Sequence, residues 1–435
     1  SLFASHSLLR SVGLLIIVIM MNPPTLSAPF AGWPLPGGAQ GGGHFSRATQ
    51  ITPDNVGNLE VAWIHRSGDY REGDNFLEGW DGVSPLQSSW QATPILIGDQ
   101  LVICTPFNRI LAIDASTGQE RWSYSPDIDL EGFFMPRCRG VTQWQNSAVA
   151  PGKKCDDVVI APLLDARVIG LDARTGSRCE FGEERELDLS RGLGGYETGI
   201  YMLNTPPAVI GNILITGGSV ADNISTAVPS GVVRAYSLMD GQLLWAWEPL
   251  LGPEGQHPNY QLNQEHTPAS ATPKYYQQGT TNSWSFLSID EELGLVFVPT
   301  GNTSPDYYGG HRNGLDYFSS SVVALKINSG EVVWHFQTVH HDIWDFDVPS
   351  QPTLFEWEKN GSSVRGLAQT TKQGYVFLLN RETGEPLFPV VETPVPQKAA
   401  EGDFTTPTQP IPTKPRSLFD FPAQRDSVWG LTFWD

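Results

Sequence analysis

Short apolar runs, separated by turns that end in glycine, recur along most of the chain. One such phrase reads LAIDASTGQERWSY at residues 111–124. Four later stretches repeat its pattern: 169–181, 234–247, 323–336 and 376–389. In each, an apolar strand leads through a turn into a second strand that carries a bulky residue. Because these apolar runs are short and are joined by tight turns, they predict β-strands rather than helices.

A glycine marks the turn in every repeat, and three repeats also carry a tryptophan at a matching distance. The glycines are Gly118, Gly176, Gly241, Gly330 and Gly384. Glycine at this point indicates a backbone with positive φ, which other residues adopt only at a cost. The tryptophans that follow, Trp122, Trp245 and Trp334, are expected to dock in equivalent places.

Several repeats have a second hairpin upstream, for example at residues 92–105, 205–218 and 285–300. Two hairpins give four strands per unit, and radially repeated four-stranded sheets form a β-propeller. We therefore predict an all-β fold, a β-propeller of four-stranded blades. The alternative is a β-sandwich whose repeats resemble one another by accident. A content of 44 Gly and 34 Pro agrees with short strands and tight turns, not with long helices.

The N-terminal segment differs from the rest of the chain. Residues 12–21 are apolar, with Arg10 before them and Pro23 after. Ten residues are too few for a helix that crosses a bilayer, which needs about 20. We predict an export signal or a single N-terminal anchor at 1–31, with a buried strand or helix as the alternative. The propeller domain is then 32–435, and because the sequence stops in an apparent strand, we expect it to lack its last blades.

Charge and cysteine content restrict the partners and the compartment. The formal net charge of −20 argues against nucleic acid and anionic membrane surfaces as partners, and suits neutral or small ligands. The four cysteines contain no C-x-x-C pair, so a zinc ribbon or a thioredoxin-type site is not expected. For Cys104, Cys138, Cys155 and Cys179, disulfides in any of three pairings and buried free thiols both remain open.

The stretch TVHHDIWDFDVP, residues 338–349, concentrates ionisable side chains beside a tryptophan. Adjacent side chains of a strand point to opposite faces, so His340 and His341 are not expected to share one metal ion. Orienting hydrogen bonds or packing are the expected roles of these histidines. We expect Asp342 and Asp347 to serve turns.

Long phrases of the chain resemble one enzyme family. These are QITPDNVGNLEVAW, CRGV, GSVADNISTAVPSGVVRAY, NSWSFLSIDEELGLVFVPTGNTSPDYYGG and FSSSVVALKINSGEVVWHFQTVHHDIWDFDVPSQPTL. They closely resemble the dehydrogenases that depend on pyrroloquinoline quinone (PQQ), in the branch of membrane glucose dehydrogenase and quinate dehydrogenase. The resemblance implies an eight-bladed propeller that holds PQQ on its axis. It also implies a periplasmic protein and leaves attachment to the inner membrane open.

The resemblance further implies a set of site residues. Asp345 matches the catalytic base that takes the hydroxyl proton of an alcohol. Lys372 matches a lysine that contacts the quinone oxygens, and Trp284 matches a tryptophan that stacks flat on PQQ. For the metal, Ca²⁺ or Mg²⁺, the matching ligand positions are Asp222 and Asn302. Their neighbours Asn223 and Asp306 are alternative ligands, and turn formation is the structural alternative for the pair Asn302 and Asp306.

Further positions are expected near the cofactor or the mouth of the pocket. Arg139 and Arg66 match family arginines that suit the carboxylates of PQQ, and Thr205 adds a hydroxyl donor. Two residues depart from the glucose-oxidising pattern. Met135 stands where those relatives carry histidine, and Gln91 where they carry glutamate, so glucose is not established as the substrate.

The expected activity is therefore oxidation of a small-molecule alcohol, namely a sugar, a polyol or a cyclic hydroxy acid, with electrons passed to membrane ubiquinone. The chain has no C-x-x-C-H motif for a built-in c-type haem. The competing hypothesis is a non-catalytic exported propeller that acts as a scaffold in envelope protein assembly. The repeats alone do not separate the two hypotheses.

Overall fold

The computed structural model describes residues 32–70, 88–133, 135–249, 276–312, 315–359 and 361–419. The predicted export segment, 1–31, and the end of the chain therefore lie outside the described residues. Within the described ranges the regular secondary structure consists of strands, apart from one 3₁₀ turn, η1 (Val56–Asn58). No helix in this part of the chain is long and apolar enough to cross a membrane.

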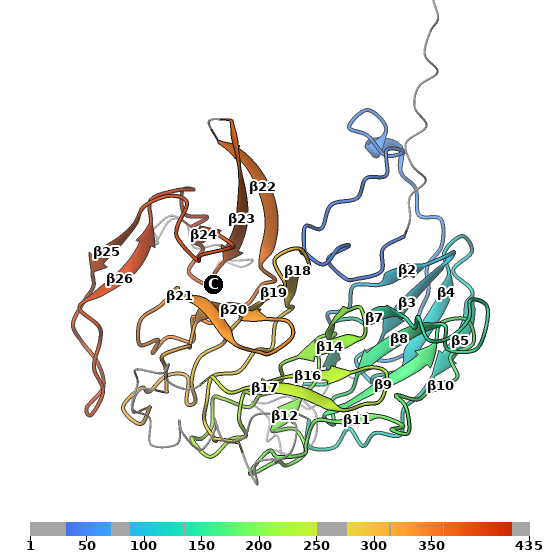
Figure 1. Cartoon of the computed structure of the whole chain (residues 1–435), viewed down its shortest axis with the longest axis horizontal. Helices are drawn as coiled ribbons and strands as arrows, with labels where there is room; N and C mark the ends of the chain where they lie inside the picture. Colours follow the sequence, from blue (N-terminus) through green and yellow to red (C-terminus); the bar gives the residue numbers. More distant parts are fainter. Residues whose placement is uncertain are drawn as a thin grey trace, which may run out of the picture. The chain divides into compact units, whose positions relative to one another are not determined.

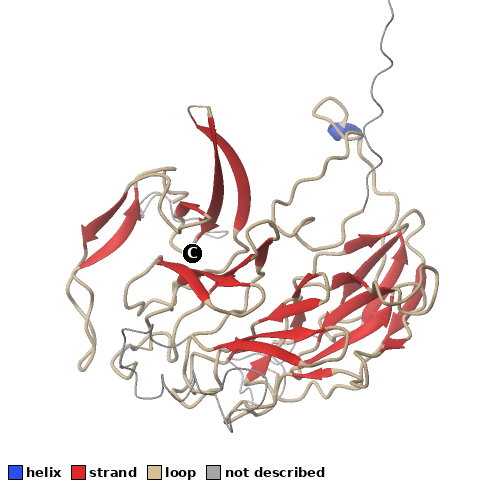
Figure 2. Ribbon diagram, in the orientation of Figure 1, coloured by secondary structure: helices blue, strands red, loops and turns tan. Residues whose placement is uncertain are grey.

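Five antiparallel sheets follow one another along the chain, each built from strands that are consecutive or nearly so (Figure 1, Figure 2). The first contains β2 (Ile95–Ile97), β3 (Gln100–Cys104), β4 (Ile110–Asp114) and β5 (Glu120–Tyr124). The second contains β7 (Thr142–Gln145), β8 (Asp157–Pro162), β9 (Arg167–Asp172) and β10 (Arg178–Cys179), and β11 (Leu187–Asp188) also pairs with β9.

The third and fourth sheets each have four strands in chain order, and the fifth has three. The third contains β13 (Ala208–Ile210), β14 (Ile213–Thr216), β16 (Val233–Ser237) and β17 (Leu243–Trp247). The fourth contains β18 (Ser288–Asp290), β19 (Leu295–Pro299), β20 (Ser321–Lys326) and β21 (Val332–Gln337). The fifth has three strands, β22 (Thr353–Lys359), β23 (Ser362–Thr370) and β24 (Val376–Asn380). The predicted all-β fold with four-stranded units is confirmed.

Three two-stranded ladders pair segments that lie outside these five sheets. They are β1 (Ser89–Trp90) with β6 (Arg137–Cys138), β12 (Tyr201–Met202) with β15 (Ser219–Val220), and β25 (Val390–Pro394) with β26 (Thr408–Pro412). The first of these ladders is parallel, and the other two are antiparallel.

The hydrophobic core is divided into layers between neighbouring sheets. One cluster joins the first sheet to the second, another joins the second to the third, and two more continue the series to the fifth. Inner strands are therefore buried on both faces, as in β20, where Ser321 to Leu325 are all buried. Sheets that pack face to face in chain order are the blades of a propeller.

Each marker glycine has φ between 69° and 76°, as the repeat predicts. At four of the five, a tryptophan from an earlier part of the chain packs against the turn, and its indole Nε1 donates to the carbonyl oxygen three residues before the glycine. The pairs and their N–O distances are Trp63–Ala115 (3.1 Å), Trp122–Ala173 (3.0 Å), Trp245–Ile327 (2.7 Å) and Trp334–Arg381 (3.1 Å). The prediction that the repeat tryptophans dock in equivalent places is confirmed.

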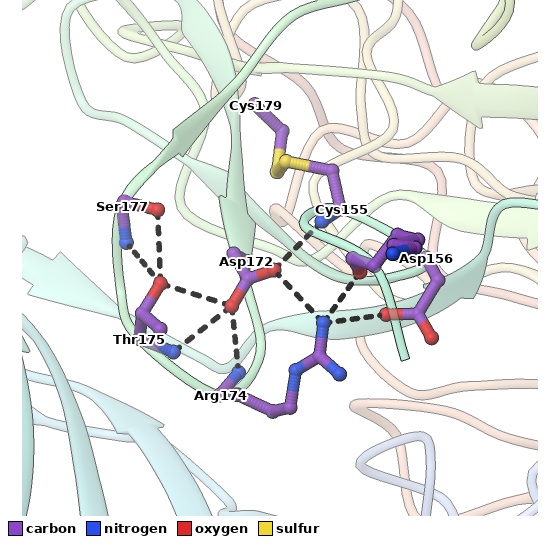
Figure 3. The surroundings of a disulfide bond; sticks show 8 residues. Cys155, Asp156, Asp172, Arg174, Thr175, Ser177 and Cys179 are labelled. Carbon is purple, nitrogen blue, oxygen red and sulfur yellow. Dashed lines mark hydrogen bonds and ion pairs between the residues drawn. A yellow bond between two sulfur atoms is a disulfide. The ribbon is translucent and has the colours of Figure 1, made fainter. Parts of the chain in front are cut away.

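The second sheet departs from this scheme, because its last strand carries Cys179 and no tryptophan. A disulfide joins Cys179 to Cys155 (Figure 3). Beside it, the carboxylate of Asp172 accepts the backbone N–H of Cys155 at 2.7 Å and that of Thr175 at 3.0 Å. The other pair, Cys104–Cys138, links the first sheet to β6. Of the alternatives that the sequence left open, the structure therefore has two disulfides, which account for all four cysteines.

Candidate functional site

The loop after β21, residues 338–350, is held in an unusual conformation by its own side chains. The Asp342 carboxylate accepts the backbone N–H groups of Trp344 (2.9 Å) and Phe346 (2.8 Å) and the Ser320 hydroxyl (2.6 Å). His341 and Asp345 both have positive φ, 44° and 56°. Non-glycine residues adopt such angles only where surrounding contacts hold them. Asp342 thus serves the turn, as predicted, and this turn sets the direction of Asp345.

His341 connects this loop to two others. Its Nδ1 lies 2.7 Å from Asp316 and its Nε2 lies 2.9 Å from Asp403. The ring also stacks on Phe404 with centroids 3.8 Å apart. Burial alone lowers the pKa of His341, but the two carboxylates more than offset this, so its pKa is raised. His340 instead bonds to Gln337 and Glu392 nearer the surface, so the two histidines have the orienting role that the sequence predicts.

We expect His341→Ala to destabilise the protein by about 3–5 kcal/mol, because it leaves the buried carboxylate of Asp403 and the partly buried carboxylate of Asp316 without their partner. The raised pKa of His341 gives a contribution that is complete below about pH 6.5 and is lost as pH rises through the folded value. The lowered pKa values of Asp316 and Asp403 give contributions that are present above about pH 4 and are lost in acid. The melting temperatures of wild type and His341→Ala should therefore differ most between about pH 4 and about pH 6.5.

His340→Ala is the matched control, because the neighbouring imidazole is one-third exposed and its ion pair with Glu392 is at the surface. We expect it to cost less than about 1 kcal/mol. Equal losses for the two variants, or a loss from His341→Ala that does not vary with pH, would contradict the assigned role of His341.

Asp345, Asp347, Lys372 and Trp284 lie together, although they come from three separate segments. The Lys372 ammonium, in the turn between β23 and β24, is 2.9 Å from Asp345 Oδ1 and 3.3 Å from Asp347 Oδ2. The Trp284 indole, before β18, donates to Asp347 Oδ2 at 2.9 Å. Lys372 Nζ is also 5.9 Å from the centroid of the Trp284 ring. Asp345, Lys372 and Trp284, which the sequence predicts as base, quinone-contacting lysine and stacking ring, thus lie together.

Asp347 joins this group to the loop between β19 and β20. Its second oxygen, Oδ1, accepts the backbone N–H of Asn302 at 2.5 Å. Sequence analysis predicted only a turn role for Asp347, and the structure corrects this. No local pattern in the sequence indicates this role, because the Trp284 indole that donates to Asp347 lies 63 residues away along the chain. The only signal in the sequence was the position of Asp347, two residues after the expected base Asp345 in a loop rich in acidic residues.

Asn302 and Asp306 lie on the same β19–β20 loop and are buried. The Asn302 amide donates to the carbonyl oxygens of Asp306 and Asp342, both at 2.9 Å, and so holds this loop against the loop of Asp345. Asp306 Oδ1 is buried and has no hydrogen-bond partner in the described structure. Asp222, between β15 and β16, accepts the Asn282 amide at 2.6 Å, while Asn282 Oδ1 is likewise without a partner among the described residues.

The acids of this group outnumber its cations. Burial raises the pKa of Asp347 to about 7, although Lys372 opposes the shift, and burial raises the pKa of Asp222 to about 6. Burial, together with the charges of Asp222, Asp347 and Asp345, raises the pKa of Asp306 to about 9. Burial would lower the pKa of Lys372, but the neighbouring carboxylates more than offset this and raise it. The site therefore has one firmly protonated lysine and an excess of acid.

Arg139, after β6, approaches the Trp284 plate as well. Its Nη1 donates to Asn204 Oδ1 (2.5 Å), to the Thr205 hydroxyl (3.1 Å) and to the Trp284 carbonyl (3.2 Å). Its Cζ lies 5.0 Å from the centroid of the Trp284 ring. All three acceptors are neutral, so among the described residues the guanidinium has no acid partner. A recess beside it is lined by Thr205, Ser283 and Trp284, among others.

Three of the expected residues are not brought into the group. Arg66 is exposed and has no hydrogen bond or ion pair with the described residues. Asn223 is exposed beside Asp222. Gln91 is exposed just after β1, where its amide donates to Ser89 at 3.1 Å. Their expected roles stay predictions.

Comparison with known proteins agrees with this fold. Residues 33–435 match the PQQ family described as "Glucose/ethanol/alcohol dehydrogenase, beta-propeller domain". The chain belongs to the PQQ-dependent dehydrogenase family. This membership accounts for the repeated sheets.

Among its relatives in this family, the quinoprotein glucose dehydrogenase of Escherichia coli K12 is 37% identical over 416 residues, which is 93% of this chain and 49% of that protein. The quinate/shikimate dehydrogenase (quinone) of Acinetobacter baylyi is 30% identical over 453 residues, which is 100% of this chain and 53% of that protein. The solved structure of the quinohemoprotein alcohol dehydrogenase ADHIIG of Pseudomonas putida superposes with a TM-score of 0.60 at 25% identity. The superposition covers 83% of this chain and 49% of that chain. The chain thus spans about half the length of the relatives it matches.

The residues present fit the two groups that the family implies. Carboxylate and amide oxygens are the ligands that Ca²⁺ and Mg²⁺ prefer, and the unpartnered oxygens of Asp306 and Asn282 lie in an acid-rich setting. No three His, Cys, Asp or Glu residues stand at metal-holding positions in the described part of the chain, so amide oxygens are needed to complete such a ligand set. The flat Trp284 ring and the acid-free Arg139 guanidinium suit an aromatic acid.

Proposed function

We propose that this chain carries the PQQ site of a dehydrogenase that oxidises an alcohol group of a sugar, polyol or cyclic hydroxy acid. The observation that carries the proposal is the convergence of Asp345, Lys372 and Asp347 beside the Trp284 ring. An exported scaffold propeller needs no buried acids beside a lysine, and burying them without a function is costly.

In this proposal Asp345 is the general base. Lys372 donates to its Oδ1, and the Tyr307 hydroxyl lies 3.5 Å from Oδ2, on the exposed side of the loop. Oδ2 is therefore the oxygen that accepts the hydroxyl proton of the substrate. When bound, PQQ supplies the acceptor for two electrons, and Ca²⁺ or Mg²⁺ polarises its quinone oxygens as a Lewis acid.

The other residues bind and orient. Trp284 forms the floor for the cofactor, and Asp347 fixes the tilt of the indole through Nε1. Arg139 and Thr205 receive a cofactor carboxylate. The oxygen-rich side, where the cation binds, is supplied by Asp222, Asp306, Asn302 and Asn282.

We further propose that the protein works in the periplasm, attached to the inner membrane, and passes its electrons to ubiquinone. The relative from A. baylyi, whose name includes a quinone, supports this acceptor.

The test is reconstitution of the full-length protein. We expect PQQ to quench tryptophan fluorescence only when Ca²⁺ or Mg²⁺ is added, and the loaded protein to reduce an artificial dye with at least one of glucose, glycerol and quinate. Reduction of a soluble ubiquinone analogue then checks the acceptor. If the protein neither binds PQQ nor reduces dye across the panel, the scaffold hypothesis replaces this one.

A further inference from the structure

The β25–β26 hairpin has no place in the assignments above, although the loop at its tip contacts the candidate site. Among the described residues, its two strands pair only with each other, and most of their residues are partly or fully exposed. The side chain of Asp403, in the loop that joins the strands, is an exception and is only 1% exposed. Charged side chains are rarely buried to this extent unless they are paired, so the partners of Asp403 indicate its role.

Asp403 connects two loops through its two carboxylate oxygens. Its Oδ1 lies 2.9 Å from His341 Nε2, in the loop after β21. Its Oδ2 accepts the backbone N–H of Gly309, in the loop between β19 and β20, at 2.7 Å. A Cβ on Gly309 would overlap the His341 ring, so the two loops approach each other as closely as a glycine allows. The Asp403 carboxylate bridges them at this point.

Other residues of the hairpin strengthen the same contact. The Phe404 ring stacks on the bound imidazole with centroids 3.8 Å apart. The Tyr308 hydroxyl donates to the carbonyl oxygen of Glu401 at 3.3 Å. Gln409 binds the backbone of His340 twice, because it accepts the N–H at 2.8 Å and donates to the carbonyl oxygen at 2.7 Å. The hairpin therefore holds both loops through several independent contacts.

The two loops that the hairpin joins are the ones that surround the proposed base. Asp345 follows the bound imidazole by four residues and has a positive φ of 56°, which only surrounding contacts maintain. The Tyr307 hydroxyl, two residues before Gly309, lies 3.5 Å from Asp345 Oδ2. The Asn302 amide already joins the same loops by donating to the Asp342 carbonyl oxygen at 2.9 Å. The hairpin supplies a second connection between them.

We propose that Asp403 is a positioning residue of the dehydrogenase, and that the β25–β26 hairpin fixes the place of Asp345 through it. The inference rests on the function proposed above. Asp403 acts through His341 and Gly309 by keeping their loops at one separation, and it does not touch the reacting atoms. A carboxylate suits this task because its two oxygens accept from two donors at once.

The experiment compares Asp403→Ala with wild type after reconstitution with PQQ and Ca²⁺. Turnover is expressed per bound PQQ, counted by fluorescence titration, so that a loss of folded protein alone leaves the value unchanged. We expect kcat per bound PQQ to fall by about 10- to 100-fold, the effect of a small misplacement of a reacting group. The affinity for PQQ should stay close to that of wild type, because the residues proposed to bind the cofactor lie on other segments.

Asp403→Asn is the conservative variant. Its amide oxygen still accepts the Gly309 N–H, and its NH₂ group donates to a neutral His341. We expect this variant to recover most of the kcat that Asp403→Ala loses. Absence of any recovery would contradict the bridging role.

Glu392→Gln is the matched control. Glu392 belongs to the same hairpin and also pairs with a histidine, His340, but its side chain is 52% exposed. We expect this variant to keep the kcat and the PQQ affinity of wild type. The inference is overturned if Asp403→Ala has the wild-type kcat per bound PQQ, or if Glu392→Gln loses as much as Asp403→Ala.

Hydrogen exchange of the protein without cofactor separates this inference from the proposed function. The measurement compares peptides that cover residues 301–310 and 338–347 in wild type and in Asp403→Ala. We expect faster exchange of both segments in the variant, because the amides of this region are then less firmly held. If no alcohol is oxidised by wild type, the proposed function fails, but faster exchange still supports the connection through Asp403. Unchanged exchange rejects it.

Discussion

Asp345→Asn lowers turnover of the reconstituted protein by about 10²- to 10⁴-fold and leaves its affinity for PQQ unchanged, if Asp345 is the base. Asparagine has the same shape, but its amide does not accept the hydroxyl proton at neutral pH. The loop keeps its conformation, because the side chains that hold it, Asp342 and His341, are unchanged in this variant. Dye reduction gives kcat, and quenching of tryptophan fluorescence gives PQQ affinity.

Asp347→Asn provides the comparison within the same loop. Asp347 Oδ2 accepts both the Trp284 indole and Lys372, and Oδ1 accepts the backbone N–H of Asn302. The amide of asparagine has a single acceptor oxygen, so it loses either the two bonds on Oδ2 or the bond to Asn302, and the floor of the pocket changes. We expect this variant to bind PQQ more weakly, whereas Asp345→Asn affects turnover alone. Turnover of Asp345→Asn within a few fold of wild type would remove Asp345 from the mechanism.

Gly330→Ala destabilises the protein far more than Gly294→Ala, although both glycines lie in turns of the fourth sheet. Their φ angles are nearly equal, 69° and 66°, so the backbone strain of alanine is the same, about 1 kcal/mol. A Cβ on Gly330 lies 2.5 Å from the Trp245 ring, whereas a Cβ on Gly294 has nothing within 4 Å. The clash adds about 1–3 kcal/mol.

The measurement is the denaturant midpoint of the two variants, with the slope checked for equal exposure on unfolding. Their difference isolates the tryptophan contact between the third and fourth sheets from the conformational preference of the turn. Equal midpoints for the two variants would show that the Trp245 ring moves aside easily and that the docking contact contributes little to stability.

The repeat shows how far pattern analysis reaches. Short apolar runs and marker glycines identify hairpins because both depend on residues close in sequence: a buried strand needs a short apolar run, and a tight turn needs positive φ. The spacing of Trp122, Trp245 and Trp334 likewise predicts equivalent positions. It does not indicate that a ring packs on the glycine of a later unit, as Trp245 does on Gly330, because that contact joins two sheets.

The cysteine pairing and the contacts of the acidic loop 338–350 are likewise beyond what local sequence patterns predict. Four cysteines allow three pairings, and only the packing of β6 on the first sheet brings Cys138 to Cys104. Asp345 was identified through the resemblance of its whole motif, whereas Asp347 looked like an ordinary turn residue. Its partners Trp284 and Lys372 are 63 and 25 residues away, so no local pattern contains them.

Strands, turns, the blade repeat and, through long matching phrases, the family could all be predicted without coordinates. These properties follow from short-range backbone preferences and from residues that stay adjacent along the chain. The membership of the site could not be predicted in this way: Asp347 entered it, Asp403 reached its loops from the β25–β26 hairpin, and Arg66 stayed outside. Hydrogen bonds and charges act over a few ångströms in space, whatever the separation in sequence, so the packing of the sheets had to bring these side chains together first.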